Sequence, residues 1–367
     1  MRIRISVAPY RRRFGRPLAS SRGAIVEREG LILSLTDTDG RVGRGEAAPI
    51  SWIDGESLDA VAAELAGLGE ALELPARVLD EQDTHRFAWL DEIGRGLLPS
   101  ARAALDAASL DLAARRAGVS AARRLGAGNE APVLLNALVV ESSPDEVTRI
   151  VRARIERGYR VIKLKVGVAE PRLDIARVRA ARDALGDRAT LRLDANAAWS
   201  FGDARDVLEA IGPASLDYVE EPLAGATVES LLRLRALTGV PLAMDESVYR
   251  VGGIESLMAS RCCDVVVLKP ARVGGPTRTL EIARRLGASG FRVVLTDAIE
   301  TAVGRAAVVH AAAALATFNG SEAIGLGGLE LLAPDPCAER SDDIPGLTAF
   351  FAKGPGLTIA AVRETML

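Results

Sequence analysis

Lysine is scarce in this chain, and its few positions are the first candidates for chemistry. Among 46 lysine and arginine residues the sequence holds four lysines: Lys163, Lys165, Lys269 and Lys353. A guanidinium keeps its proton in a protein, whereas an ammonium group can lose one and act as a base. The alternative is accidental survival in an arginine-rich composition. The residues around each lysine distinguish a role in chemistry from chance survival.

Ionisable residues recur near the ends of successive apolar runs. These positions are Lys165, Asp194, Glu220 or Glu221, Asp245, Lys269 and Asp297. Asp194, Glu220 and Asp245 would supply the hard oxygen ligands that suit Mg²⁺, for which Mn²⁺ could substitute. Lys165 and Lys269 would flank that ion, and burial beside other cations is expected to lower their pKa values. Such a site can remove a proton α to the carboxylate of a small substrate, with the metal stabilising the enediolate.

The apolar runs predict the strands that position these residues. The candidate strands are 133–140, 161–166, 190–196, 216–222, 241–247, 265–270, 292–298 and 322–326. Helical patterns rich in Ala, Leu and Arg separate them. Eight such alternations favour a closed α/β fold, a (β/α)8-type (modified TIM) barrel, over an open sheet. The C-terminal strand ends of such a barrel meet at one mouth.

Alternation along the strands places the polar residues on the inner face. In the second candidate strand Lys163 and Lys165 share a face, and in the third Arg192, Asp194 and Asn196 share one. The opposite faces are apolar and must pack on the outer helices. The polar faces then point into the barrel mouth, where buried charges require opposite charges or a metal. A salt bridge or a solvated strand end explains one such residue but not six in a row.

The first part of the chain predicts a different organisation. Residues 1–115 contain a hairpin pattern with Asp39 and Gly40 at the turn, followed by two amphipathic helical patterns. They are interpreted as an α+β capping domain ahead of a catalytic barrel at 116–335. The proline-rich tail at 336–367 is expected to return to the capping domain.

The composition argues against several classes of function. The net charge is -3, the sequence pI is near 5.7 and aromatic residues make up 4%. A dedicated nucleic-acid binder needs a basic surface and usually stacking aromatics, so no nucleic-acid partner is expected. No run of residues is typical of a signal peptide or a membrane span. The three cysteines are a small and odd number, which argues against a disulfide scaffold. We therefore expect a cytoplasmic protein without membrane contact.

The polar motifs, taken in order, resemble those of a known family. They are KLK (163–165), DAN (194–196), VEEP (219–222), MDES (244–247), LKP (268–270) and ETAVG (300–304). Their order and spacing are similar to the enolase superfamily, in the muconate cycloisomerase subgroup. GRGEAAP (43–49) resembles the N-terminal capping domain of the same proteins. Each motif alone is weak, but the ordered set is specific and spans nearly the whole chain.

The resemblance implies a role for each matching position. Three residues match the Mg²⁺ ligands of the superfamily: Asp194, Glu220 and Asp245. The match selects Glu220 over Glu221, a choice that strand alternation leaves open. Lys165 matches the catalytic base and Lys163 its supporting neighbour. Lys269 matches the lysine opposite, which is a second acid/base in racemases and an electrostatic partner in the other enzymes.

Other positions are expected to support the site or to contact the substrate. Asn196, Asp297 and Glu300 adjoin the motifs. The run 16–33 and the GLGG stretch resemble o-succinylbenzoate synthases, in which the capping loop closes over a succinyl arm. Ser21 or Arg22 would then bind the carboxylate of that arm, although Arg22 can equally be an ordinary surface arginine.

The resemblance to these synthases implies the syn dehydration of 2-succinyl-6-hydroxy-2,4-cyclohexadiene-1-carboxylate, a step of menaquinone biosynthesis. N-succinylamino acid racemases, dipeptide epimerases and cycloisomerases share the lysine pair and remain alternatives. The acidic DxD signature of dipeptide epimerases is missing from 323–335. A non-catalytic barrel that binds an anion is the alternative from another class. Members of the superfamily often form symmetric assemblies, so a homo-oligomer is possible.

Overall fold

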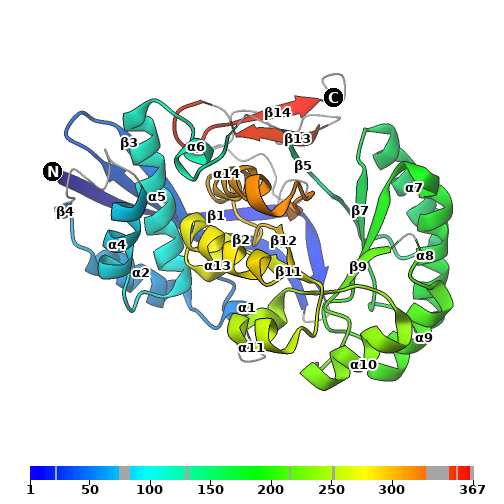
Figure 1. Cartoon of the computed structure of the whole chain (residues 1–367). Helices are drawn as coiled ribbons and strands as arrows, with labels where there is room; N and C mark the ends of the chain where they lie inside the picture. The colour runs from blue at the N-terminus through cyan, green and yellow to red at the C-terminus, as the bar shows by residue number, and fades with distance from the viewer. Residues whose placement is uncertain are drawn as a thin grey trace.

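The described residues form three sheets and the helices that cover them (Figure 1). The computed structural model describes residues 1–20, 23–73, 83–128, 132–214, 216–249, 253–327, 347–352 and 354–363. The first sheet is antiparallel, with the order β3-β2-β1-β4. Its strands are β1 (Arg2–Ser20), β2 (Gly23–Thr36), β3 (Val42–Ala47) and β4 (Ala71–Glu73). The predicted hairpin at Asp39 and Gly40 is confirmed, since β2 and β3 pair across that turn and Gly40 has a φ of 81°.

Helices cover this sheet, and one of them packs unusually close to it. The helices of this region are α1 (Ser51–Asp54), α2 (Leu58–Gly67), α4 (Asp83–Ile93), α5 (Pro99–Ala117) and α6 (Ala121–Arg124). A Cβ at Gly43 or Gly45 of β3 would overlap the carbonyl oxygens of Ala108 and Ala104 in α5. Glycine in the strand and alanine in the helix therefore let the two backbones approach each other.

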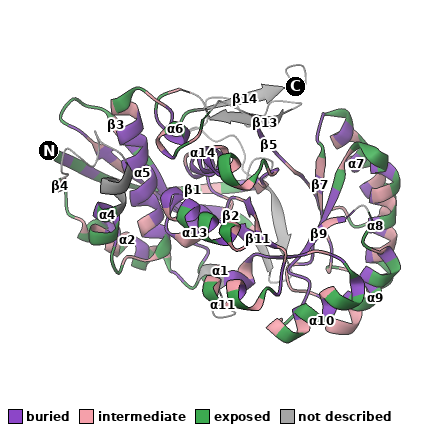
Figure 2. Cartoon of the chain, in the orientation of Figure 1, coloured by how far each residue is buried: buried purple, intermediate pink, exposed green. Residues whose placement is uncertain are grey.

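The second sheet is parallel and follows the order of the chain. Its strands are β6 (Ala137–Val139), β7 (Val161–Lys165), β8 (Thr190–Asp194), β9 (Leu216–Glu220), β10 (Leu242–Met244), β11 (Val265–Leu268) and β12 (Arg292–Leu295). Its helices and 3-10 turns are α7 (Pro144–Glu156), α8 (Pro171–Leu185), η1 (Gly186–Arg188), α9 (Phe201–Ile211), α10 (Val228–Thr238), η2 (Glu246–Tyr249), α11 (Gly253–Ser260), α12 (Pro270–Val273), α13 (Pro276–Ala288) and α14 (Ala302–Asn319). The helices expose their outer faces, while the strands are buried (Figure 2). The predicted α/β barrel class is confirmed.

The eighth predicted strand is shorter than expected. Residues 322–326 form two isolated parallel bridges, Leu135 with Ile324 and Thr296 with Gly325. The segment thus pairs with both edges of the parallel sheet. These contacts close the curled sheet without a regular eighth strand.

An ion-pair network fills the end of the barrel opposite the predicted site. The Arg192 side chain lies 2.8 Å from Asp217 Oδ2 and 2.8 Å from Glu322 Oε2. Arg292 binds the same two carboxylates at 2.8 and 2.9 Å. The prediction that Arg192 points into the barrel mouth is therefore wrong. Asp217, Arg292 and Glu322 stand where their strands begin, and these opposite charges draw the guanidinium toward that end.

The end of the chain forms the third sheet. Strands β13 (Leu347–Ala352) and β14 (Ile359–Arg363) pair with β5 (Val133–Leu134), which precedes the barrel. Leu357 N also donates to Asp111 Oδ1 of α5 at 2.8 Å. The tail therefore touches both the N-terminal helices and the start of the barrel. The domain boundaries near residues 115 and 335 stay predictions.

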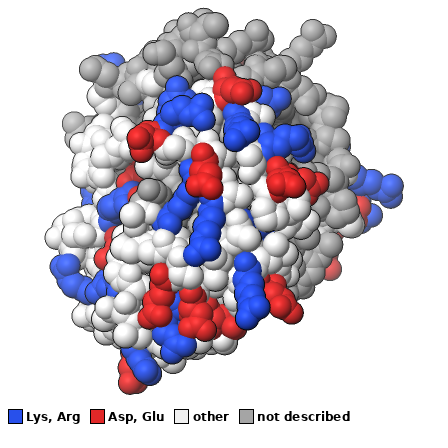
Figure 3. Space-filling view, turned by 90° about the vertical axis from the view of Figure 1, so that its right-hand side faces the viewer, with Lys and Arg blue, Asp and Glu red and all other residues white. Residues whose placement is uncertain are grey.

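The surface over α7 to α10 carries charges of both signs. In Figure 3, which shows this side of the molecule, Lys and Arg are interspersed with Asp and Glu. Among the described residues of this face, the basic side chains form no continuous patch for a polyanion. Among the described residues, no helix is long and apolar enough to cross a membrane.

His310 joins three elements and is fully buried. Its Nδ1 accepts a hydrogen bond from Ala122 N at 2.9 Å, so its Nε2 carries the proton and lies 2.8 Å from Thr358 O. Burial lowers the pKa of His310 from the ordinary value of 6.5 to about 4. The neutral ring therefore links α14, α6 and the tail.

We expect this histidine to make the fold sensitive to acid. Between pH 6.5 and pH 4 the unfolded chain binds a proton that the folded chain does not, so stability is full above pH 6.5 and falls as the pH drops. The contribution of His310 to this loss, between about pH 7.5 and about pH 5, should be about 2 kcal/mol. Urea unfolding of the unmodified protein and of His310→Gln at the two pH values measures it as the difference between their pH dependences. Equal pH dependences of the two proteins would contradict the assignment.

Candidate active site

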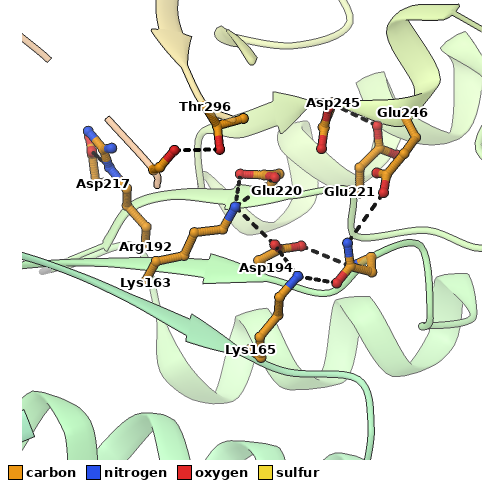
Figure 4. A network of polar contacts seen from close by, with 12 residues as sticks. Lys163, Lys165, Arg192, Asp194, Asp217, Glu220, Glu221, Asp245, Glu246 and Thr296 are labelled. Atoms are coloured by element: carbon orange, nitrogen blue, oxygen red, sulfur yellow. Dashed lines mark hydrogen bonds and ion pairs between the residues drawn. The ribbon is translucent and has the colours of Figure 1, made fainter. Parts of the chain in front are cut away.

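Three buried carboxylates stand side by side at the C-terminal ends of adjacent strands (Figure 4). Asp194 ends β8, Glu220 ends β9 and Asp245 follows β10, with exposures of 1%, 1% and 3%. The strand register pairs Asp194 directly with Glu220. Parallel strands bring their ends to one edge, so the three carboxylates form a row at the barrel mouth.

Two lysines of β7 bind one end of this row. Lys163 Nζ lies 2.8 Å from both carboxylate oxygens of Glu220 and 2.9 Å from Asp194 Oδ2. Lys165 Nζ lies 2.6 Å from Asp194 Oδ2 and also donates to Asn196 Oδ1. The two-residue spacing places both lysines on the inner face of the strand, as the sequence predicts. Asn196 also donates its backbone N–H to Asp194 Oδ1, at 3.1 Å.

A third lysine binds the other end of the row. Lys269 directly follows β11 and donates to Asp245 Oδ2. Arg272, one turn later in α12, lies 3.9 Å from Asp245 Oδ1. Lys165 and Lys269 therefore bracket the carboxylate row, one at each end.

The proton affinities of these groups reflect their pairing. Burial opposes the charge of Asp194, but Lys163 and Lys165 outweigh it and lower its pKa. Burial raises the pKa of Glu220, and neighbouring Asp194 adds to this against the pull of Lys163. Burial also opposes the charge of Lys163, but Asp194 and Glu220 raise its pKa well above the usual value. Lys163 is thus held as a cation, which suits a supporting role better than that of a base.

Glu221 lies outside the row although it adjoins Glu220. Its backbone has a φ of 43°, and its side chain leaves the inner face of the strand. Its Oε1 accepts from Asp245 N at 2.8 Å and Ser247 N at 2.7 Å, and its Oε2 accepts from Ser247 Oγ at 2.7 Å. Burial and the charge of Glu246 raise the pKa of Glu221 to about 7. Glu221 therefore holds the turn that carries Asp245.

The chemistry of the donor set suits a hard divalent cation. Three buried carboxylates lie at the ends of three adjacent strands, and Asp245 Oδ1 is buried without a hydrogen-bond donor among the described residues. In the described part of the chain, no three acidic, His or Cys side chains are arranged to hold a metal ion. Each carboxylate instead binds a lysine ammonium. Asp194, Glu220 and Asp245 as Mg²⁺ ligands stay a prediction, which the oxygen-rich donor set supports.

Two further predicted residues belong to a neighbouring cluster. Asp297 Oδ1 accepts from Gly327 N at 2.9 Å, and the Glu300 carboxylate accepts from Ala298 N. Burial, Asp297 and Glu46 raise the pKa of Glu300 to about 8. These contacts fix the loop after β12 rather than the carboxylate row. Ser21 and Arg22 lie outside the described residues.

A buried ion pair outside the sequence motifs supports the backbone of Lys165. Arg177 of α8 donates to the backbone oxygen of Lys165 at 2.8 Å and pairs with Asp174 at 2.9 Å. Asp174 Oδ2 accepts from Gly167 N at 2.7 Å and from Trp199 Nε1 at 3.1 Å. A signal existed, since helical spacing puts Asp174 and Arg177 on the same face as the buried Val178 and Ala181.

Comparisons with known proteins agree with this geometry. Residues 146–363 match the family described as "Enolase C-terminal domain-like", and residues 2–126 match "Mandelate racemase / muconate lactonizing enzyme, N-terminal domain". The chain is 39% identical to the o-succinylbenzoate synthase of Thermobifida fusca over 208 residues, which cover 56% of this chain and 62% of that protein. This match spans less than two thirds of the relative.

Two other relatives match over more of their length. A hydrophobic dipeptide epimerase of Roseobacter litoralis is 33% identical over 309 residues, covering 84% of this chain and 86% of that protein. The structure of the dipeptide epimerase from Enterococcus faecalis V583, complexed with Mg and the dipeptide L-Leu-L-Tyr, has a TM-score of 0.84 at 26% identity. It covers 98% of this chain and 100% of that one. With both domains matched and the ionisable strand ends in order, the chain belongs to the enolase superfamily.

Proposed function

We propose that this enzyme is an o-succinylbenzoate synthase, which dehydrates 2-succinyl-6-hydroxy-2,4-cyclohexadiene-1-carboxylate. The observation that carries the proposal is the unequal access to the three amines. The side chain of Lys165 is 22% exposed, against 13% for Lys163 and 11% for Lys269. One amine open to the substrate is sufficient for syn elimination, in which the proton and the hydroxyl leave from the same face. The similarity to the Thermobifida fusca enzyme supports the same reaction.

The proposed mechanism uses Lys165 twice. Its neutral amine removes the proton α to the carboxylate, and the electrons of that C–H bond move into the carboxylate to give an enediolate. When the enediolate collapses, these electrons form the new C=C bond as the C–O bond breaks. The ammonium then returns its proton to the departing hydroxyl, which leaves as water. Lys269 stays charged beside Asp245 and stabilises the negative charge that develops on the substrate.

Mg²⁺ held by Asp194, Glu220 and Asp245 would neutralise the charge on the substrate carboxylate and so acidify the α-proton. Asn196 accepts a hydrogen bond from Lys165 and donates its backbone N–H to Asp194, so it keeps the base next to the carboxylate row. Asp174 and Arg177 fix the backbone at the same point. Magnesium complexes of dipeptide epimerases support this choice of ion.

A racemase or epimerase is the second candidate. Lys165 and Lys269 at the two ends of the row could serve as bases on opposite faces of an α-carbon. The longer matches to dipeptide epimerases favour this chemistry. The sequence of 323–335 lacks the DxD signature with which dipeptide epimerases bind the ammonium of the substrate. This absence favours an N-succinylamino acid as the racemase substrate.

A substrate panel tests the proposal. The purified protein with Mg²⁺ is incubated in D₂O with the cyclohexadiene carboxylate, with N-succinylamino acids and with dipeptides, and followed by ¹H NMR. We expect aromatic product from the first substrate. Exchange of the α-proton in the other substrates without elimination would replace the proposal by the racemase. A lack of reaction with every substrate would contradict both.

A further inference from the structure

A buried carboxylate of the N-terminal region binds the segment that follows Lys269. Asp106, in the middle of α5, is 1% exposed. Its Oδ2 accepts from Thr277 N at 2.8 Å, and its Oδ1 accepts from Thr277 Oγ1 at 2.7 Å. Thr277 lies in the first turn of α13, so a carboxylate from another helix caps that N-terminus.

The chain between Lys269 and Thr277 is short and closely hydrogen-bonded. Lys269 O accepts from Arg272 N at 2.9 Å and from Val273 N at 3.2 Å, and Gly275 N donates to Pro270 O at 2.8 Å. The helix α12 therefore connects the backbone of Lys269 to the start of α13 without a flexible segment. A shift of Thr277 must be transmitted to Lys269 or absorbed by breaking these bonds.

Two glycines let α5 approach this segment. Gly274 and Gly275 have φ values of 95° and 111°, a region that other residues rarely adopt. A Cβ on Gly275 would overlap the Asp106 carboxylate, and a Cβ on Gly274 would lie 3.0 Å from Arg102 Cδ. Arg102 and Asp106 are four residues apart and lie on one face of α5. This face of α5 therefore packs directly against the backbone that follows Lys269.

We infer that Asp106 is a positioning residue for Lys269, acting across the contact between α5 and the barrel. The inference rests on the proposed function, because that function gives Lys269 the role of stabilising the negative charge that develops on the substrate. Small displacements of such a group slow turnover strongly while they leave substrate binding nearly unchanged. The N-terminal region would then influence the rate of the chemical step through this contact.

The same helix offers a matched control. Asp111 is 2% exposed and accepts from Arg44 N at 2.9 Å, Arg115 Nε at 2.8 Å and Leu357 N at 2.8 Å. It is a buried, multiply bonded carboxylate like Asp106, but its contacts lead to the tail and to β3 rather than to Lys269. Asp106→Ala and Asp111→Ala each remove one buried carboxylate, with its hydrogen bonds, from α5.

The experiment compares the two variants in the full-length protein with Mg²⁺. For Asp106→Ala, which removes both acceptors of Thr277, we expect kcat to fall about tenfold or more, with KM changed by less than about threefold. Asp111→Ala should keep kcat within about twofold at a similar Tm. Hydrogen–deuterium exchange should quicken for amides 269–279 in Asp106→Ala only. Equal losses of kcat in both variants, or a loss confined to KM, would overturn the inference.

A second pair covers the case in which Asp106→Ala does not fold. Thr277→Val removes the hydroxyl that Asp106 binds, and Thr277→Ser restores it. Thr277→Val should lower kcat and quicken amide exchange at 269–279. Thr277→Ser should keep both kcat and the exchange rates close to those of the unmodified protein. Equal behaviour of the two variants would contradict the positioning role. If the unmodified protein turns over none of the substrates, the proposed function fails. In that case the positioning role is tested by hydrogen–deuterium exchange at 269–279 alone, because this measurement does not require turnover.

Discussion

Replacing Lys165 by arginine is expected to lower kcat by about 10³-fold, because arginine keeps the positive charge but cannot give up a proton. The guanidinium can still pair with Asp194, which Lys165 contacts at 2.6 Å. Substrate and metal binding should therefore change little. Steady-state kinetics with the cyclohexadiene carboxylate, and wash-out of the α-proton in D₂O, measure the effect.

Lys269→Arg is the matched comparison. In a syn dehydratase Lys269 contributes its charge but transfers no proton. The fold-decrease in kcat of Lys269→Arg should therefore be less than about a tenth of that of Lys165→Arg. In a racemase the two substitutions should be equally damaging to racemisation. Full activity of Lys165→Arg would contradict the mechanism and favour a barrel that only binds an anion. Circular dichroism and Tm confirm that each variant is folded.

Removing one carboxylate from the row is expected to abolish activation by Mg²⁺. In Glu220→Gln the neutral amide is a poor ligand for Mg²⁺ and a poor partner for Lys163, which lies 2.8 Å from both Glu220 oxygens. We expect kcat to fall by about 10³-fold and Mg²⁺ affinity to fall by at least about tenfold. Calorimetric titration with Mg²⁺ and the metal dependence of kcat measure the two effects.

The neighbouring glutamate provides the control. Glu221 is equally buried, but it accepts hydrogen bonds from Asp245 N and Ser247 N, which a glutamine oxygen can also accept. Burial and the charge of Glu246 raise its pKa to about 7, so the neutral form is already well populated near pH 7. Glu221→Gln should thus keep Mg²⁺ affinity and lose less than about tenfold in kcat. Similar Mg²⁺ affinities in the two variants would contradict the assignment of Glu220, as would activity that survives exhaustive EDTA treatment.

Much of the barrel could be predicted because its signals are local. Alternating apolar residues mark the strands around Lys163 and Asp194, and the strand order follows the chain because parallel βα units connect neighbours. The β2–β3 hairpin follows from the turn at Asp39 and Gly40. The regular strand predicted at 322–326 is reduced to two isolated bridges. These bridges depend on both edges of the sheet, which the local sequence does not record.

The sequence alone determined which residue types stand at the strand ends: three carboxylates and lysines that can exchange protons. Only the tertiary structure decided how they pair. Strand alternation could not separate Glu220 from Glu221, because a positive φ at Glu221 turns its side chain toward Asp245 and Ser247. The contact of Asp106 with Thr277 likewise joins residues 171 positions apart. Such contacts depend on how helices pack on the sheet, and no local pattern records that packing.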